Sequence, residues 1–213
     1  MKDTFEEIVN NALKSLFQNR IIFHSEADFQ HALAMTIAEN ENIKIRLEKP
    51  CTISGDNQNG NIKIDIELTA NEDEKDFKYA IELKYKTKKF NCTYFGENFD
   101  LKTQGAQPNS RYDFWKDCER ITKLENFCGG CVIFLTNDAL YNITNEKGIL
   151  IIDKVEDLKT RFPLYGKISG NKRDSKINLS KSVSLGEWES ENLETKDVKS
   201  DKNNIFYYII AKI

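Results

Sequence analysis

The segment KYAIELKYKTKK at residues 78–89 constrains the fold more than any other stretch of the chain. Large apolar residues occupy every second position from 79 to 85, which is the period of two typical of a β-strand. The alternate positions carry Glu82 and Lys84, so this face is neither plainly solvated nor plainly apolar. Any fold that uses this strand has to place a partner opposite Glu82 and Lys84.

The remaining chain shows the periodicity of helices and strands in turn. Helices are expected where apolar residues recur at three- and four-residue intervals, and Ser25 is the expected N-cap of the second helix. Strands are expected where the period is two, or where a β-branched apolar run is continuous. The expected helices are 3–18, 25–40 and 109–127, and the expected strands are 43–50, 61–70, 78–89, 131–137 and 205–213.

This order predicts an α/β fold with a mixed β-sheet flanked by helices. Short polar connections favour an antiparallel meander of the first three strands. The helical crossover that follows favours parallel pairing of 131–137 beside the meander. The stretch 87–106 is expected to be irregular, and the charge-dense segment 166–204 is expected to be a solvated loop. All 213 residues are expected to form a single domain with its core at about 20–137.

Composition limits the classes of partner. The formal net charge of −3 gives no global basic field, so a nucleic-acid partner would need a local patch of positive charge. Lysines cluster at 84–89 and at 166–176, where they are either phosphate contacts or members of solvated loops. No run approaches about 18 apolar residues and the first residues are unlike a secretory signal, which predicts a soluble, cytoplasmic protein without a membrane partner.

Two carboxylates and a lysine are expected to meet on neighbouring strands. Asp65 lies in the strand before Glu82 and Lys84, on the face opposite the isoleucines of its own strand. Converging carboxylates near a lysine are costly unless something compensates their charge. A divalent cation such as Mg²⁺, which takes oxygen ligands and keeps several waters, would do so.

Asp65 followed by Glu82-Leu83-Lys84 resembles the motif of the PD-(D/E)XK nuclease superfamily, which has a restriction-endonuclease-like fold. The resemblance implies an αβββαβ core with a C-terminal β extension here. It implies that Asp65 and Glu82 bind Mg²⁺, with Mn²⁺ as a substitute, and that Lys84 is the catalytic lysine. The implied activity is that of a metal-dependent endonuclease, a hydrolase of phosphodiester bonds in nucleic acid, with DNA as the expected substrate.

The same resemblance extends to residues outside the motif. Glu26 is similar to the additional glutamate that many members carry on a helix before the meander. Several further residues resemble an accessory motif on the next helix, and they are the candidates for substrate binding. They are Gln104, Gln107, Arg111 and Tyr112.

Two features depart from the family pattern. Ile64 stands where the family has a proline, and the spacing from Gln107 to Tyr112 is one residue longer than usual. The segments SEADFQHALA and QGAQPNSRYDFWKD also resemble a group of uncharacterised bacterial proteins assigned to the superfamily.

Alternative interpretations remain open for each site residue. Glu82 and Lys84 would also fit a cross-strand ion pair, Asp65 a surface position, and Glu26 a favourable charge at a helix N-terminus. Gln107 and its neighbours would fit helix-surface packing. For the whole chain the alternative is a catalytically inactive nuclease-fold protein that binds a partner in a defence or mobile-element system. A homodimer is a further option, because restriction-type cutting of two strands resembles the work of a dimer.

The cysteines offer one more alternative. The pair Cys128 and Cys131 forms a lone Cys-x-x-C that would fit a redox centre, but small buried cysteines leading into an apolar strand fit as well. His24 and His31 are expected to be structural, and Asp138 is expected to be a turn or cap residue.

Overall fold

The computed structural model describes residues 1–53, 62–105, 107–142, 167–168, 171–172, 177, 179–193 and 203–213. These residues form three α-helices, namely α1 (Lys2–Asn19), α2 (Glu26–Ile37) and α3 (Gln107–Thr122). The main sheet contains β1 (Lys44–Cys51), β2 (Ile62–Glu72), β3 (Lys75–Lys86), β6 (Gly129–Thr136), β9 (Ser184–Leu185), β10 (Glu189–Asn192) and β11 (Ile205–Lys212). The remaining elements are β4 (Phe90–Tyr94), β5 (Glu97–Leu101), the 3₁₀ helix η1 (Ala139–Tyr141), β7 (Lys167–Ile168) and β8 (Asn171–Lys172).

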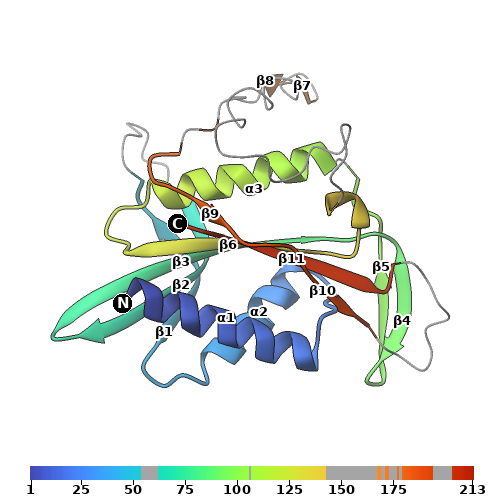
Figure 1. Cartoon of the computed structure of the whole chain (residues 1–213), viewed down its shortest axis with the longest axis horizontal. Helices are drawn as coiled ribbons and strands as arrows, with labels where there is room; N and C mark the ends of the chain where they lie inside the picture. Colours follow the sequence, from blue (N-terminus) through green and yellow to red (C-terminus); the bar gives the residue numbers. More distant parts are fainter. Residues whose placement is uncertain are drawn as a thin grey trace.

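Seven of the described strands form one mixed sheet with helices on both faces, which confirms the expected α/β class. The strand order is β1-β2-β3-β6-β11-β10, and β9 pairs with β11 beside β10. β3 and β6 are parallel, while the other neighbours are antiparallel. Figure 1 shows α1 and α2 against one face of this sheet and α3 against the other. The antiparallel meander and the parallel pairing across the α3 crossover are therefore both present.

The first helical layer owes its position to aromatic side chains. Phe5 of α1 stacks on Tyr79 of β3, with ring centroids 5.5 Å apart. Phe29 of α2 lies 6.4 Å from Tyr85 of the same strand. Both strand residues belong to the large apolar set of the alternating segment, so this face of β3 is buried by α1 and α2. Burial of such side chains contributes about 1.5–3 kcal/mol each.

The second core lies between α3 and the opposite face of the sheet. Trp115 and Phe114 of α3 are fully buried there, and Phe134 of β6 lies 5.9 Å from Phe114. Ala80 precedes Glu82 on this face of β3 and belongs to the same core. Glu82 and Lys84 therefore point toward α3, at the margin of an apolar layer.

Two segments contradict the expectations from the sequence. The stretch expected to be irregular contains the β4–β5 hairpin, whose two-residue turn, Phe95 and Gly96, has φ values of 48° and 78°. Phenylalanine is rare in that left-handed conformation, so the first turn position lacked the usual asparagine, aspartate or glycine signal. β10 lies inside the expected solvated loop. All four of its side chains are exposed, because β10 joins the sheet through its backbone pairing with β11.

α3 also differs from its expected range, since it ends at Thr122 and does not reach residue 127. Leu124 leaves the helical path and forms an isolated bridge with Ile53. No helix of the described residues is long and apolar enough to cross a membrane.

Gly130 allows α3, β6 and β3 to approach closely, and this contact generates a stability prediction. A Cβ at this position would lie 2.5 Å from Ile121 Cγ2 and 2.7 Å from the carbonyl oxygen of Ala80. The backbone of Ala80 cannot move without disturbing the parallel pairing of β3 and β6. Gly130→Ala should therefore lower the free energy of unfolding in urea by about 2–3 kcal/mol.

Gly105→Ala is the matched control, because nothing lies within 4 Å of a Cβ built at Gly105. It should change the unfolding free energy by less than about 0.5 kcal/mol. Equal stability of the two variants would show that the α3–sheet contact tolerates an added methyl group.

Candidate active site

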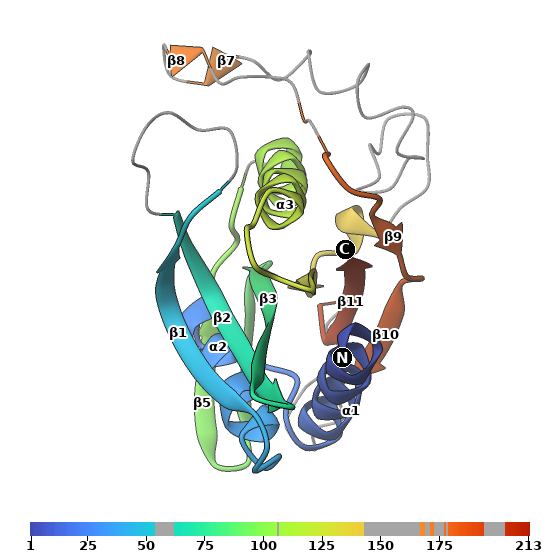
Figure 2. The same ribbon diagram turned by 90° about the vertical axis from the view of Figure 1, so that its left-hand side faces the viewer.

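β2 and β3 separate at Asp65, and this separation creates the candidate site. The paired register of the two strands runs from the hairpin end to Ile66 opposite Ile81 and stops there. Figure 2 shows β2 and β3 splaying apart toward their ends nearest α3. At the point of separation, Asp65 Oδ2 accepts a hydrogen bond of 2.6 Å from the backbone N–H of Leu83. The carboxylate of Asp65 thus takes the place of a β2 carbonyl in the ladder.

The alternation of side chains along β2 shifts at the same point, which corrects one expectation. The isoleucines of β2 were expected on one face, opposite Asp65. Ile64 packs in the core beneath α3, whereas Ile66 packs in the core beneath α1 and α2. The bend that separates the strands also interrupts the alternation of side chains between the two faces of β2. The two neighbours of Asp65 are therefore buried on opposite faces of the sheet.

Glu26 occupies the next position along the open edge of β3. It is the first residue of α2, and Ser25 caps that helix as expected by accepting a hydrogen bond from the N–H of Asp28. Glu26 Oε2 accepts a hydrogen bond of 2.7 Å from the N–H of Tyr85 and lies 4.0 Å from Lys86 Nζ. Asp65 and Glu26 therefore bind alternate N–H groups on one edge of β3.

Gln30 holds the backbone of Asp65 from the side of α2. Its amide Nε2 donates to the carbonyl oxygen of Asp65 at 2.6 Å and to Glu48 Oε1 at 3.1 Å. Glu48 has a φ of 52°, a conformation that asparagine or glycine adopts more readily. Gln30 was not identified from the sequence, because a polar residue on a helix gives no sign of its partner.

The carboxyl group of Asp65 lies beside that of Glu82. Burial raises the pKa of Asp65, and the hydrogen bond from the N–H of Leu83 offsets part of this rise. Burial, followed by repulsion from the carboxylate of Asp117, raises the pKa of Glu82 to about 9. Only 2% of Glu82 is exposed. The structure thus brings Asp65 and Glu82 together, as expected.

Lys84 lies on the same face of β3 and is paired with a residue that the sequence analysis did not identify. Its Nζ is 2.5 Å from Asp117 Oδ2 of α3, and both side chains are largely buried. Burial lowers the pKa of Lys84, but the nearby carboxylates of Asp117 and Glu26 outweigh it and raise the pKa above its ordinary value. Lys84 is therefore fully charged at neutral pH.

Arg120, one turn further along α3, completes the arrangement. Its Nη2 lies 2.9 Å from Glu82 Oε1, and the same nitrogen is paired with Asp117 Oδ1. We refer to Asp65, Glu82, Lys84, Asp117 and Arg120 as the charged cluster. It contains three carboxyl groups and two basic groups, so full ionisation would leave one negative charge in excess.

The sequence did contain a signal for Asp117. Phe114 and Ile121 belong to the apolar stripe of α3, and Asp117 lies three residues after the first and four before the second. A charged residue at that spacing faces the core. Only 5% of Asp117 is exposed, and burial is the main cause that raises its pKa.

The donor set of the charged cluster fits a hard divalent cation in part. Asp65 and Glu82 lie side by side, and a divalent ion bound between them would offset the negative charge of their carboxylates. Mg²⁺ is commonly held by one or two carboxylates while it keeps several waters. Within the described part of the chain, no group of three or more Asp, Glu, His or Cys side chains is arranged to enclose a metal ion.

The lysines of the segment 84–89 serve more than one carboxylate. Lys86 lies near Glu26, as described above, and Lys88 Nζ lies 3.7 Å from Asp138 Oδ1. Both side chains retain partial exposure, 24% for Lys86 and 41% for Lys88. The second lysine-rich segment, 166–176, lies largely outside the described residues.

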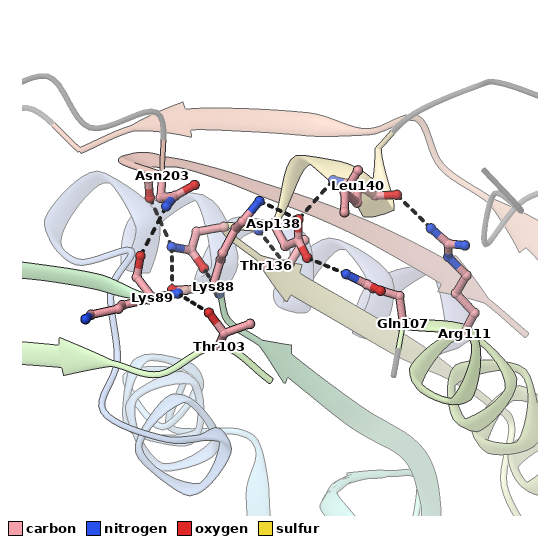
Figure 3. Close-up of polar contacts among 10 residues, drawn as sticks. Lys88, Lys89, Thr103, Gln107, Arg111, Thr136, Asp138, Leu140 and Asn203 are labelled. Atoms are coloured by element: carbon pink, nitrogen blue, oxygen red, sulfur yellow. Dashed lines mark hydrogen bonds and ion pairs between the residues drawn. The ribbon is translucent and has the colours of Figure 1, made fainter. Parts of the chain in front are cut away.

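Two of the four expected substrate-binding residues, Gln107 and Arg111, contact the segment that follows β6 (Figure 3). Gln107 Nε2 donates to Asp138 Oδ2 at 2.9 Å, and Arg111 Nη2 donates to the carbonyl oxygen of Leu140 at 2.6 Å. Asp138 also accepts from the N–H of Leu140 and caps η1, as expected of a cap residue. Gln107 and Arg111 thus fasten the start of α3 to the segment after β6, and their contact with a substrate stays a prediction.

Gln104 and Tyr112 occupy different environments. Gln104 is exposed, and its backbone N–H donates to the carbonyl oxygen of Thr87 at 2.8 Å. Tyr112 is buried in the core beneath α3. The cysteines are free, and Cys131 is buried within β6, in agreement with the packing interpretation.

Comparison with protein-family models, with curated proteins and with solved structures returned no match to this chain. The nuclease resemblance therefore rests on the quoted residues.

The pKa of Glu82 generates a prediction for stability in the absence of metal. The folded-state value of about 9 exceeds the ordinary value of 4.5, so the folded chain keeps a proton that the unfolded chain releases between these pH values. In EDTA, the free energy of unfolding should therefore fall as the pH rises from about 5 to about 9. Glu82→Gln cannot ionise and should lose most of this slope in urea titrations at several pH values.

Glu72→Gln serves as the control, because Glu72 is an exposed carboxylate at the end of β2. It should keep the wild-type slope. A full slope in Glu82→Gln would assign the pH dependence to other groups.

Proposed function

We propose that this protein is a Mg²⁺-dependent phosphodiesterase that hydrolyses nucleic acid, with DNA as its substrate. The observation that carries the proposal is the convergence of three side chains where β2 and β3 separate: Asp65, held on the N–H of Leu83, the buried Glu82, and Lys84, held by Asp117. Two carboxylates and an ammonium group at the mouth of separating strands are the groups that metal-assisted phosphodiester hydrolysis requires.

Asp65 and Glu82 would hold the metal ion, which supplies a Lewis acid and a water of lowered pKa when it is bound. Mn²⁺ would substitute, because it accepts the same oxygen ligands. Asp65 keeps one oxygen on the N–H of Leu83, which fixes the direction of its carboxylate. Glu26, anchored on the N–H of Tyr85, contributes further negative charge at the same edge of β3.

Lys84 stabilises negative charge that develops on the phosphate. Two roles are open to this lysine, as a charge stabiliser or as a base that deprotonates water. Its raised pKa and its ion pair with Asp117 favour the first role, because a protonated ammonium group cannot accept a proton. Asp117 then acts as a positioning residue for Lys84.

Phosphate contacts would come from local positive charge near the site, since the chain has a net charge of −3. Lys86 and Lys88 follow Lys84 at two-residue intervals and are more exposed than it. Backbone phosphates need only such local charge, so these lysines are the expected contacts for the strand that is cut.

Substitution of the two central residues tests the proposal. Asp65→Asn keeps the size and the acceptor for Leu83, and Lys84→Ala removes the ammonium group. Each should lower Mg²⁺-dependent cleavage by at least about 100-fold, as loss of a key electrostatic group does. The assay is a panel of single- and double-stranded DNA and RNA with Mg²⁺ and with Mn²⁺.

Lys63→Ala is the matched control, because Lys63 is an exposed lysine on the neighbouring strand β2. It should retain wild-type cleavage, and circular dichroism should be unchanged in all three variants. Undiminished cleavage by Asp65→Asn and Lys84→Ala would reject the proposed mechanism.

A second candidate function is a catalytically inactive protein that uses the same fold to bind a partner. One observation favours it: Arg120 is already paired with Glu82, as the basic group of an inactive site would be. Metal binding separates the two functions, because an inactive site has no need to accept an ion.

Isothermal titration calorimetry with Mn²⁺ provides that separation. The phosphodiesterase should bind Mn²⁺ with a heat that disappears in Asp65→Asn. A binding protein without a metal site should give the same trace for the wild type and for this variant, and that result would favour the second candidate.

A further inference from the structure

Arg120 makes a contact with Glu82 that the proposed hydrolysis does not use. Its Nη2 lies 2.9 Å from Glu82 Oε1, on the side chain expected to ligate the metal. The exposed fraction is 35% for the Arg120 side chain and 2% for that of Glu82. The guanidinium thus reaches from the surface into the charged cluster.

Arg120 brings a positive charge to Glu82 without forming an aligned hydrogen bond to it. Among the described residues, neither Glu82 Oε1 nor Arg120 Nε has a hydrogen-bond partner, although both atoms are buried. A buried carboxylate oxygen that faces a cation without an aligned donor is free to accept another positive charge in its place. Arg120 is also paired with Asp117 Oδ1, and the partial exposure of its side chain gives it a path from Glu82 to solvent.

Charge balance decides what happens when a divalent ion enters. A metal ion binds the ionised form of Glu82, and with both basic side chains in place the three ionised carboxylates of the charged cluster then leave one negative charge in excess. A divalent ion added to this set would give one positive charge in excess, whereas an ion that replaces Arg120 would leave the cluster neutral. A net charge of either sign destabilises the folded protein where the side chains are buried.

We propose that Arg120 occupies the position at Glu82 that a divalent metal ion would take and that the ion displaces it, so that Arg120 sets the metal affinity of the site. This inference rests on the proposed function, because it concerns the same metal site. At low metal concentration, Arg120 occupies the charge-binding position at Glu82 and keeps the site from loading. At higher concentration, the ion takes Glu82 and the guanidinium withdraws from the charged cluster toward solvent.

Mn²⁺ titration calorimetry on three variants tests the competition. Arg120→Gln removes the competing charge and should bind Mn²⁺ about tenfold more tightly than the wild type, which corresponds to about 1.4 kcal/mol. Arg120→Lys keeps the charge on a shorter reach and should give an intermediate affinity. Lys123→Gln is the matched control, since Lys123 lies one residue beyond the end of α3 and pairs with Glu119 at 2.6 Å. It should bind Mn²⁺ within about twofold of the wild type, as a screened charge outside the site does.

Nuclear magnetic resonance gives an independent readout of the displacement. The side-chain Nε–Hε signal of Arg120 can be assigned by its loss in Arg120→Lys. Addition of Mg²⁺ to the wild type should shift this signal, and addition to Asp65→Asn should leave it in place. This measurement decides the matter even if Arg120→Gln fails to fold.

The outcomes separate the inference from the proposed function. Equal or weaker Mn²⁺ binding by Arg120→Gln, with binding by the wild type that depends on Asp65, would overturn the role of Arg120 and leave the metal site standing. An Nε–Hε signal that does not move on loading would do the same. Absence of Mn²⁺ binding in both the wild type and Arg120→Gln would overturn the metal site as well.

Discussion

The separation of β2 from β3 is the constraint on which the candidate site depends. Where the ladder ends, the N–H groups of Leu83 and Tyr85 lose their strand partner, and buried backbone donors without acceptors are destabilising. Asp65 and Glu26 supply the acceptors. Because a carboxylate accepts hydrogen bonds without donating any, this solution also concentrates negative charge at the opening. The same residues that complete the sheet edge therefore create the demand for a cation.

α3 places one acidic and one basic side chain, Asp117 and Arg120, at this opening. Asp117 holds Lys84 in its protonated form, while Arg120 balances Glu82. Asp117 also repels Glu82 and contributes to the raised pKa of that group. In the proposed function, α3 would therefore have two effects: it would keep Lys84 charged for a phosphate, and it would place Arg120 against the side chain that is to bind the metal.

Much of the fold could be predicted from the sequence, because apolar periodicity determined which face of each element is buried. β2, β3, β6 and the cap at Ser25 follow such local signals. The β4–β5 hairpin and β10 could not be found this way, since an unusual turn residue and an exposed edge strand leave little trace in the side-chain pattern. Asp65, Glu82 and Lys84 could be placed together by strand parity. Arg120 could not, because nothing local to α3 shows that its guanidinium reaches Glu82.

The buried charges are better explained by chemistry than by stability. An ion pair removed from water stabilises a fold little, and an apolar side chain of similar size often serves as well or better. Around Asp117 the setting for such a side chain already exists, since Phe114, Trp115 and Ile121 form a dry layer on the same helix. Five ionisable groups in this layer therefore lower the stability that α3 could otherwise provide. A site that must accept a cation and a phosphate needs these groups, whereas a helix that only covers a sheet does not. In the proposed function, the metal-free cluster is then a resting state. Lys84 lies where the phosphate would bind, and Arg120 lies where the metal ion would bind.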